Sequence, residues 1–406
     1  MKVTLINHSD SLGGASTVTF RLMHALREAG VDARMLVTHK TTDSPYVHVA
    51  ASRPRARIPF LAEYLRIWLH CRLARKNLFQ VSIATDGLPL SRHPLVRDAD
   101  VVVLNWVNQG MLSLAEIRKI AREKPTVWTM HDMWNLTGIC HHAGVCDRFL
   151  THCHDCAMLG AGAGKHDAAA RTFDAKMVLY DSAPIHFVAV SNWLADAARR
   201  SALLRGRDIS VINNPYSVEN VGTSKLTRAE LGLPADGRII LFCAARIDDP
   251  MKNLPDAIDA LNTLVDTDAV AVFVGACKNP QALDGLRLPH CNLGPIYDRR
   301  RLAAIFGHAS VVMSSSAFES FGATLLEGQA AGATPVAPIH DGRADIITDG
   351  LTGYAAAEGI RSLGDALRLA LERPIAAADL RAAADRFSYP AIADRYITLF
   401  TTLTKA

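Results

Sequence analysis

The sequence predicts an α/β protein built from two doubly wound, Rossmann-like domains. Short apolar runs such as "KVTLIN", "ADVVVLNW" and "RIILFCAAR" alternate with longer amphipathic stretches along nearly the whole chain. Such alternation is typical of βαβ units that form parallel sheets. The 406 residues are too many for one ordinary core, and the stretch at 210–235 is rich in Asn, Pro, Gly and Ser without a strong period. We therefore expect two domains joined near Asn214.

Ten apolar runs are expected to be strands, each followed by a helix or a turn. Six precede the junction, at 2–7, 33–39, 99–106, 125–130, 185–191 and 209–214, and four follow it, at 238–246, 269–275, 310–315 and 333–338. A last helix is expected to begin near Pro390, with Ile392, Tyr396 and Phe400 on one side. The predicted domains are 1–212, with a cysteine-rich insertion at 138–160, and 213–386, followed by a C-terminal segment at 387–406.

Composition excludes several classes of protein. About half of the residues (49%) are apolar and 21% are charged, as in a soluble globular protein. The net charge of +4 is too small to indicate nucleic-acid binding. The N-terminus "MKVTLINHSD" has no basic region followed by a long apolar one, and no window approaches 18 apolar residues. We expect a cytoplasmic protein.

Residues that directly follow strands are the functional candidates, because ligands of open parallel sheets bind at the carboxyl ends of the strands. Gly13 and Gly14 follow the first run and precede a helix, where backbone N–H groups can approach an anion. A tight turn alone would explain them equally well. The pattern is not G-x-G-x-x-G, and the second run ends without an acidic residue, so a nicotinamide dehydrogenase is disfavoured.

Two glutamates, Glu319 and Glu327, lie eight positions apart in "FESFGATLLEG", after the run at 310–315. If the span were helical they would be roughly 12 Å apart, too far for the carboxylate pair of a glycoside hydrolase. The two glutamates could each bind hydroxyl groups at one end of an elongated ligand. The anionic middle of that ligand would lie on the helix N-terminus near Phe321 and Gly322. Sugar hydroxyls at both ends of a diphosphate meet this demand.

A diphosphate also requires cations, and "ARIDDPMKN" supplies Arg246 and Lys252 after the run at 238–246. Arginine binds phosphate through two parallel hydrogen bonds, and lysine acts as a mobile point charge. An Arg and a Lys six apart in a loop are more often solvated surface charges. Their place at the same sheet edge as Glu319 favours the phosphate-binding interpretation.

These residues resemble the motifs of glycosyltransferase family 4, a family of retaining enzymes with the GT-B fold, two Rossmann-like domains facing each other across a cleft. "ARIDDPMKN" is similar to the family's Arg-x5-Lys element, and Glu319 to Glu327 to its E-x7-E motif. "SLGGAS" resembles its acceptor-side glycine loop, "TMHDMW" its His-Asp segment, and "VSNWLAD" and "VINNP" its interdomain segments. The resemblance covers essentially the whole chain.

The resemblance implies a nucleoside diphosphate sugar as donor and no catalytic metal. Arg246 and Lys252 would hold the diphosphate, Glu319 the sugar and Glu327 the ribose. The Phe321 and Gly322 backbone would also contact the donor, and the final helix would return to the N-terminal domain. His131 would face the sugar from that domain, although a histidine at a strand end is also often only structural. Apolar contacts to the base are expected near "GPIYD", around Ile296.

Cys140, Cys146, Cys153 and Cys156 follow a C-x5-C-x6-C-x2-C pattern with interleaved histidines. Four thiolates could close a structural zinc site that holds a long loop. A disulfide or redox pair and free thiols are the alternatives. Some polysaccharide-assembling members of the family look similar here, and the insertion is expected to shape the acceptor cleft.

The segment 53–76 holds seven Lys or Arg residues against one acid, Glu63. If it is helical, Leu61, Tyr64, Leu65, Trp68 and Leu69 share one face. We favour packing of this face on the domain's own sheet. The alternative is a peripheral contact with the inner face of an anionic membrane, which a lipid-linked acceptor would favour.

The sequence therefore predicts a retaining glycosyltransferase that moves a sugar from a nucleoside diphosphate sugar to a glycan or lipid-linked saccharide in surface polysaccharide biosynthesis. The alternatives are a nucleotide-sugar-binding protein, or an epimerase on the same fold, without glycosyl transfer. The donor base and sugar, the acceptor and the oligomeric state are not specified by the sequence.

Overall fold

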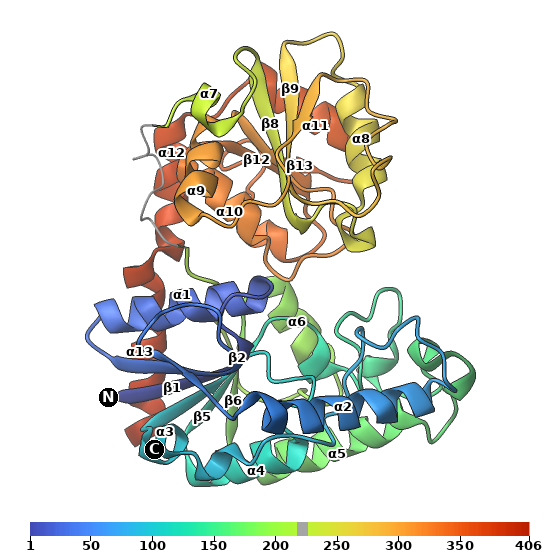
Figure 1. The fold of residues 1–406 in the computed structure, drawn as a ribbon, viewed down its shortest axis with the longest axis vertical. Helices are drawn as coiled ribbons and strands as arrows, with labels where there is room; N and C mark the ends of the chain where they lie inside the picture. Colours follow the sequence, from blue (N-terminus) through green and yellow to red (C-terminus); the bar gives the residue numbers. More distant parts are fainter. Residues whose placement is uncertain (217–225, 406) are drawn as a thin grey trace. The chain divides into compact units, whose positions relative to one another are not determined.

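The computed structural model describes residues 1–216 and 226–405. The chain divides into two compact units: Met1–Asn213 with Ile392–Ala406, and Asn214–Ala391. Figure 1 shows each unit as an α/β layer structure, with helices packed on both faces of a sheet. Most of the predicted linker, 217–225, lies outside the described residues.

The N-terminal unit has a parallel sheet of seven strands in the order β3-β2-β1-β4-β5-β6-β7. The strands are β1 (Lys2–Ser9), β2 (Asp32–His39), β3 (Val47–Val49), β4 (Val101–Leu104), β5 (Thr126–Met130), β6 (Ile185–Ala189) and β7 (Ile209–Val211). Its helices are α1 (Gly14–Glu28), α2 (Arg53–His70), α3 (Pro94–Asp98), α4 (Leu114–Glu123), α5 (Ala168–Ser182), α6 (Asn192–Arg200) and most of α13 (Tyr389–Lys405).

The C-terminal unit has a parallel sheet of six strands in the order β10-β9-β8-β11-β12-β13. The strands are β8 (Arg238–Arg246), β9 (Ala269–Ala276), β10 (His290–Asn292), β11 (Val311–Met313), β12 (Thr334–Pro338) and β13 (Tyr354–Ala356). The helices are α7 (Arg228–Leu231), α8 (Leu254–Asn262), α9 (Arg299–His308), α10 (Ala323–Ala331), α11 (Leu363–Glu372) and α12 (Ala377–Ala384).

The central strands form the core of each unit because helices cover both of their faces. All four residues of β4 are buried, and Ile239–Leu241 of β8 are fully inaccessible. Continuous apolar runs of this kind are expected for parallel strands that are buried on both sides. The predicted α/β class with two doubly wound domains is confirmed. None of the described helices is long and apolar enough to cross a membrane.

The final helix, α13, packs on the N-terminal unit although the segment before it belongs to the other unit. The hydroxyl of Tyr396 lies 3.0 Å from the hydroxyl of Thr129 in β5, and Arg395 donates to the backbone carbonyl of Val211. Ile392 and Phe400 are fully buried on the same face. The apolar residues whose periodicity predicted this helix therefore lie on the face that it buries.

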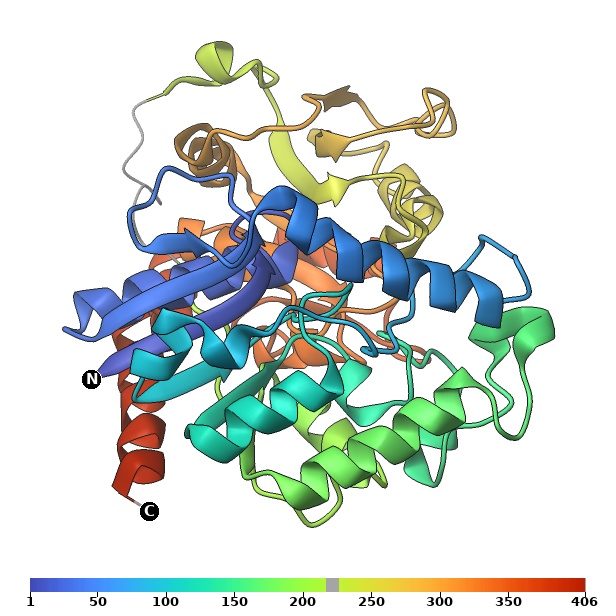
Figure 2. The same ribbon diagram turned by 60° about the horizontal axis from the view of Figure 1, so that its bottom comes forward.

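Helix α2 differs from the packing that we favoured. Pro59, Glu63 and Ile67 are buried, whereas Leu61 and Leu65 are 48% and 51% exposed. The expectation that the leucines pack on the sheet is therefore wrong, because the opposite face of the helix contacts the unit. Figure 2 shows α2 as the long blue helix lying along the surface of the N-terminal unit.

Candidate functional site

The segments after two neighbouring strands of the C-terminal sheet, β8 and β11, carry most of the predicted donor-binding residues. The chain forms β8, β9 and β10 outward in one direction, then returns and forms β11, β12 and β13 in the other. The topological switch point lies between β8 and β11, where the loops after the strands diverge and leave a crevice. Arg246 ends β8, and Glu319 follows β11 by six residues.

Lys252 and Glu319 form an ion pair between these two loops. The Lys252 Nζ lies 2.5 Å from Glu319 Oε1, which also accepts a hydrogen bond of 2.8 Å from Ser316 Oγ. Ser315 Oγ donates to the Lys252 carbonyl at 2.8 Å, so the loop after β11 holds the lysine backbone in place. The lysine and the first glutamate of the predicted motifs are therefore brought together.

The charge state of Glu319 follows from this pairing. Burial alone would raise its pKa, but the positive charge and hydrogen bond of Lys252, with the Ser316 hydroxyl, hold the pKa below its usual value. Lys252 and Ser316 both contact Oε1, and none of the described residues donates a hydrogen bond to Oε2. Oε2 is therefore available to accept a ligand hydroxyl, and the ammonium of Lys252 retains two further donors.

Arg246 lies beside two carboxylates of its own loop. Its Nη2 donates to Asp249 Oδ2 at 3.0 Å, and its Nε lies 3.5 Å from Asp248 Oδ1. Neither the Nε nor that Asp248 oxygen has a hydrogen-bond partner among the described residues, although both atoms are buried. A buried guanidinium nitrogen without a partner is costly, so an anion that accepts from Arg246 would be stabilised there.

The N-terminus of α10 completes this edge of the sheet. Phe321 is buried against Phe387, with ring centroids 5.5 Å apart, and Gly322 starts the helix with φ of +94°, a value that favours glycine. The first-turn amides of a helix have no intrahelical acceptor, and they carry the positive end of its dipole. Phe321 thus fixes the turn through its side chain while the backbone stays available.

Glu327 lies in the second turn of α10 and is half-buried. It is close enough to β8 to affect Cys243, whose pKa is raised to about 12 by burial and then by the negative charge of Glu327. Gly328, the next residue, approaches β11 so closely that a Cβ would lie 2.4 Å from the Val312 side chain. This close packing fixes the rotation of α10 and with it the direction of Glu327.

The predicted base-contact residue, Ile296, lies on the loop between β10 and α9. It is half-buried, and the next residue, Tyr297, is 89% exposed. The loop is held against β9 by a hydrogen bond of 2.9 Å from the Gly275 amide to the Gly294 carbonyl. Ile296 therefore lies on the β9 and β10 side of the switch point, beyond Arg246.

Sequence reasoning missed the buried ion pair that supports Glu319. Arg343 is fully buried and donates through Nε and Nη2 to Asp341 at 2.8 and 2.9 Å, and through Nη1 to the Ser316 carbonyl. Asp341 in turn accepts from the Glu319 amide at 2.8 Å. Gly342 lies so near Ser320 that a Cβ would be 2.1 Å from its carbonyl oxygen. The signal was present as Asp-Gly-Arg at 341–343, two residues beyond the apolar run at 333–338.

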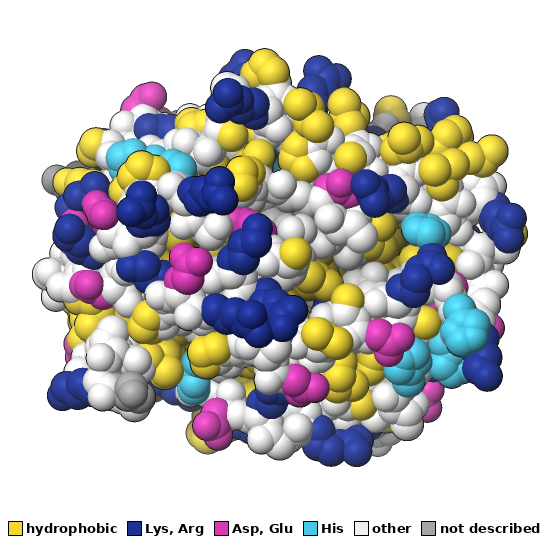
Figure 3. Space-filling model, turned by 90° about the horizontal axis from the view of Figure 1, so that it is seen from below, with side chains coloured by type: hydrophobic (Ala, Val, Ile, Leu, Met, Phe, Trp, Pro, Cys, Tyr) yellow, Lys and Arg dark blue, Asp and Glu magenta, His cyan; other side chains and the backbone are white. Residues whose placement is uncertain are grey.

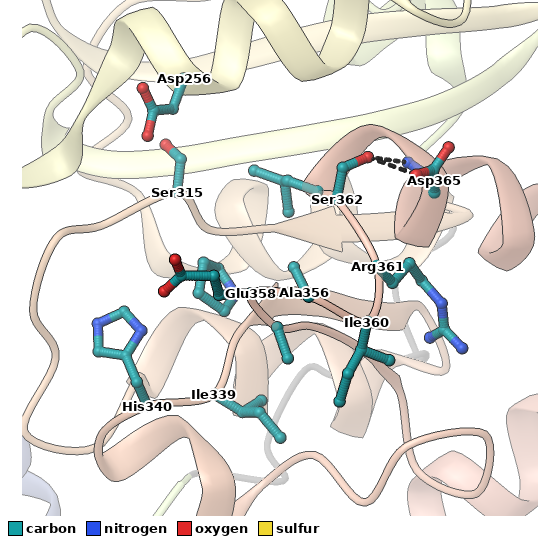
Figure 4. Close-up of a pocket in the computed structure, with 14 residues that line it drawn as sticks. Asp256, Ser315, Ile339, His340, Ala356, Glu358, Ile360, Arg361, Ser362 and Asp365 are labelled. Atoms are coloured by element: carbon teal, nitrogen blue, oxygen red, sulfur yellow. Dashed lines mark hydrogen bonds between the residues drawn. The ribbon is translucent and has the colours of Figure 1, made fainter.

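A pocket of about 800 Å³ opens at the same edge, beside the Asp341 loop. Figure 4 shows Ser315, His340 and Glu358 around it, which follow β11, β12 and β13 respectively. Ser315 also holds the Lys252 carbonyl, so the pocket borders the ion pair. Neither Lys252 nor Glu319 is among the residues that line it.

In the N-terminal unit, the glycine loop follows β1 at the switch point between β1 and β4, and the His-Asp segment follows β5, the strand next to β4. Gly13 begins α1 with φ of +88°, and a Cβ at Gly13 or Gly14 would meet no atom within 4 Å. The loop is fixed by Asp10, whose carboxylate accepts four hydrogen bonds from the backbone and hydroxyls of Thr41 and Thr42 at 2.6–2.9 Å.

His131 is held in one tautomer by Asn105. The Asn105 Nδ2 donates to the Val103 carbonyl at 3.3 Å, so its Oδ1 accepts from His131 Nε2 at 3.0 Å. Nδ1 is then the acceptor of the ring. Burial lowers the pKa of His131 to about 4, which keeps the imidazole neutral near pH 7.

Asp132 organises the surroundings of His131. Its Oδ2 lies 2.7 Å from His141 Nδ1 and accepts from Trp106 Nε1 at 3.1 Å, and its Oδ1 accepts from the Trp134 amide at 2.8 Å. Burial opposes ionisation, but His141 and these hydrogen bonds lower the pKa of Asp132 to about 2. His141 comes from the cysteine-rich insertion, so the insertion supports the His-Asp segment.

Acidification is expected to weaken the N-terminal unit between pH 6.5 and 4. An unfolded histidine titrates near 6.5, whereas His131 and His8 have pKa values of about 4 in the folded unit because they are buried. The unfolded chain therefore binds protons first, so stability that is complete above pH 6.5 is lost as the pH falls to 4. We expect each histidine to contribute about 1–2 kcal/mol to this loss of unfolding free energy after solvent screening.

Tryptophan fluorescence during urea unfolding measures this loss, because all five tryptophans lie in the N-terminal unit. The variant His131→Gln should lose less stability than the wild type over this pH range, while His8 and the other histidines of the unit whose pKa is lowered by burial, His48, His70, His93 and His186, still contribute. Equal losses in the two proteins would contradict the burial argument for His131.

The predicted zinc site is not supported by the arrangement of the four cysteines. No group of three or more His, Cys, Asp or Glu side chains in the described residues is placed to hold a metal ion. Cys140 and Cys156 pair by a hydrogen bond, Cys153 accepts from the Gly138 amide at 3.2 Å, and Cys146 is exposed. All four thiols are free, so the structure shows no disulfide among them.

A buried lysine anchors the turn that leads into the insertion. Lys176 is fully buried, donates to the carbonyls of Trp134 and Thr137 at 2.5 and 3.0 Å, and lies 3.4 Å from the centroid of the Trp134 ring. Burial lowers the pKa of Lys176 to about 7. The turn at 134–137, which follows His131, is thus tied to α5.

The two halves of the chain match two family models. The model described as Glycosyltransferase Family 4 matches residues 12–220, which is just over half of the chain, and the one described as Glycosyl transferases group 1 matches residues 224–387. Among curated relatives, a D-inositol 3-phosphate glycosyltransferase of Xylanimonas cellulosilytica is 31% identical over 230 residues. The match covers 52% of this chain and 53% of that protein, so the chain spans about half the length of the curated relative.

Solved structures show the same fold over nearly the whole chain. Sucrose-phosphate synthase from Thermosynechococcus elongatus has a TM-score of 0.68 at 17% identity, covering 99% of each chain. Anabaena HepE, solved in complex with UDP and glucose, has a TM-score of 0.64 at 17% identity, covering 99% of this chain and all of that one.

Proposed function

Because the chain belongs to Glycosyltransferase Family 4, we propose that it transfers a sugar from a nucleoside diphosphate sugar to a saccharide acceptor. The observation that carries the proposal is the pair of cations at the switch point of the C-terminal unit. Arg246 has a buried guanidinium nitrogen without a hydrogen-bond partner among the described residues, and Lys252 retains two donors beyond its pair with Glu319. A diphosphate supplies the acceptors that both require.

We assign the ends of the donor from the charges around that diphosphate. A carboxylate is repelled by a neighbouring phosphate, so the two glutamates are expected to bind hydroxyl groups of the donor and not its phosphates. Glu319 has Oε2 available for a sugar hydroxyl. Glu327, half-buried in the second turn of α10, is assigned to the ribose hydroxyls. The amides of the first turn of α10 and the Gly322 backbone bind phosphate or sugar between them. Ile296 and its loop are assigned to the base.

The proposed transfer requires stabilisation of the negative charge on the departing diphosphate and does not require a nucleophilic side chain of the enzyme. The bond from the anomeric carbon to the diphosphate oxygen breaks, and a bond from that carbon to the acceptor oxygen forms on the same face. The acceptor proton passes to the departing phosphate oxygen, which yields a nucleoside diphosphate and a glycoside of retained configuration. Arg246, Lys252 and the α10 dipole stabilise the charge that develops on the departing phosphate.

His131 is proposed to contact the sugar as a neutral hydrogen-bonding group. Its Nε2 proton is directed to Asn105, so Nδ1 accepts from a hydroxyl, and its low pKa prevents it from acting as a cation at neutral pH. Gly13 and Gly14 are proposed to admit the acceptor close to the backbone, since no atom lies within 4 Å of a Cβ at either position. We propose a glycan or a lipid-linked saccharide of surface polysaccharide biosynthesis as the acceptor, on the resemblance of the cysteine-rich insertion.

A thermal-shift panel of UDP, GDP, ADP and CMP sugars tests the proposal. A ligand at 100 times its dissociation constant adds about 2.7 kcal/mol to the stability of the unit that binds it. We expect one nucleotide class to stabilise the protein, and Arg246→Gln to abolish that stabilisation. Arg287→Gln, which changes another arginine of the C-terminal unit, is the matched control.

Product analysis distinguishes transfer from the alternatives. Incubation of the stabilising donor with saccharide acceptors should release nucleoside diphosphate and give a labelled glycoside. A rearranged nucleotide sugar formed without acceptor would indicate an epimerase, and stable binding without turnover would indicate a binding protein. Failure of every nucleotide sugar to stabilise the protein would contradict the proposed donor site.

A further inference from the structure

Helix α2 presents a stripe of large apolar side chains to solvent. Ile58, Leu61, Leu65 and Leu69 are each about half exposed or more, with values from 48% to 69%. They are spaced three or four residues apart, so they lie along one face of the helix. Leu73, which follows the helix, is 56% exposed and continues the stripe. A contiguous apolar surface of this kind is unusual on a soluble domain and marks an interaction site.

The opposite face of α2 is fixed to the N-terminal unit by Glu63. Its Oε1 accepts from the backbone amides of Ile83 and Ala84 at 2.9 and 3.0 Å, and its Oε2 accepts from the Gly110 amide at 2.6 Å. Turning the stripe inward would break these three charge-assisted hydrogen bonds, and the Glu63 carboxylate would lose its donors. The stripe is therefore held outward by the structure of the unit itself.

The solvent-facing charges that the segment 53–76 itself contributes beside the stripe are of one sign, and one of them, Arg66, is paired with Asp86 at 3.0 Å. Glu63 is the one acid between residues 53 and 76, and it is buried, so the solvent-facing charges of this segment are all positive. At about 100° per residue, Arg55 and Arg66 flank one side of the apolar stripe and Arg57 the other. The exposed basic residues of the segment are Arg53, Arg55, Arg57, Arg66, Arg72, Arg75 and Lys76. Figure 3, which views the molecule from the side on which α2, α4 and α5 lie in Figure 1, shows apolar and basic side chains interspersed at the surface.

We propose that this α2 surface docks the protein on an anionic lipid bilayer, with the helix lying in the plane of the interface. The apolar stripe enters the boundary between head groups and acyl chains while the flanking arginines contact anionic head groups. A second copy of the chain is a poorer occupant, because pairing two α2 surfaces would bring their like charges together. The proposal goes beyond glycosyl transfer, since docking requires neither donor nor acceptor.

Vesicle sedimentation with the full chain tests the docking surface. The probes are vesicles of phosphatidylglycerol and phosphatidylethanolamine, compared with vesicles of phosphatidylcholine alone. We expect the protein to bind the anionic vesicles at least about tenfold more tightly, and the difference to shrink as salt is raised. The triple variant Leu61→Gln, Leu65→Gln, Leu69→Gln should bind at least about tenfold more weakly, because each leucine contributes buried apolar area.

A matched triple variant controls for loss of surface hydrophobicity in general. Val178, Val265 and Leu351 are 57%, 50% and 67% exposed and lie outside α2, so changing them to glutamine should leave vesicle binding unaltered. Circular dichroism should show both variants folded, since all six positions are solvent-facing. Absence of vesicle binding, or equal binding by the α2 triple variant, would overturn the proposal. A dimer in light scattering that the α2 variant dissociates would also overturn it, in favour of a second copy.

Discussion

The variant Lys252→Met is expected to lower kcat/KM for the donor by about 10² to 10³. The physical reason is that the charge on the departing phosphate loses one of its two cationic partners, and loss of one such donor typically has this effect on the rate. A second contribution comes from Glu319, whose Oε1 lies 2.5 Å from the lysine. Without Lys252 the Glu319 carboxylate keeps the Ser316 hydrogen bond and the more distant charge of Arg343 but loses its main positive neighbour, so its pKa is expected to rise.

Initial rates at several donor concentrations, measured as release of nucleoside diphosphate, separate the two contributions. Lys252→Arg keeps the charge and should recover part of the rate, whereas Lys165→Met, at an exposed lysine of the other unit, should have no effect. Donor affinity and kcat should both fall, because Lys252 contacts the diphosphate in the bound donor as well as in the departing nucleoside diphosphate. A Lys252→Met protein that retains kcat/KM within about threefold would remove the lysine from the proposed site.

The variant Asp341→Ala is expected to destabilise the C-terminal unit by about 3–5 kcal/mol. Arg343 is fully buried and loses both of its charge-assisted hydrogen bonds to Asp341, and an unpaired buried charge has a cost of this size. The Glu319 amide loses its acceptor as well. Activity should therefore fall even at temperatures where the variant remains folded, because Glu319 is no longer held.

Urea unfolding followed by far-ultraviolet circular dichroism measures this change, and tryptophan fluorescence, which follows only the N-terminal unit, is the internal control. The double variant Asp341→Leu, Arg343→Met removes both charges and should recover most of the stability without recovering activity. A single variant as stable as the wild type would show that the pair does not support Glu319.

The sequence was sufficient for the central strands and insufficient for the edges. Long apolar runs mark the strands that are buried on both faces, and all ten predicted runs contain strands in the structure. The three strands that were not predicted are β3, β10 and β13. Each has three residues and lies at the edge of its sheet, paired on one side. β7 and β11 are equally short but were predicted from runs rich in Val, Ile and Met, whereas β3, β10 and β13 have the sequences VHV, HCN and YAA.

The candidate site was predictable where residues of opposite charge follow neighbouring strands. The motifs around Lys252 and Glu319 meet because parallel strands end at one edge of the sheet. Asp341 was missed because an acid and a base two residues apart in a loop usually denote surface charges, and only packing reveals that both are buried. The same limit applied to α2, where periodicity identified the leucine stripe and the buried Glu63 decided which face is turned inward.

A crystal structure with the stabilising nucleoside diphosphate sugar would locate the donor. We expect diphosphate oxygens within hydrogen-bonding distance of Arg246 and Lys252, with the amides of the first turn of α10 directed at the same group. We also expect a sugar hydroxyl on Glu319 and ribose hydroxyls on Glu327. A donor bound elsewhere in the chain, with Arg246 still lacking an acceptor for its Nε, would contradict the proposed donor site.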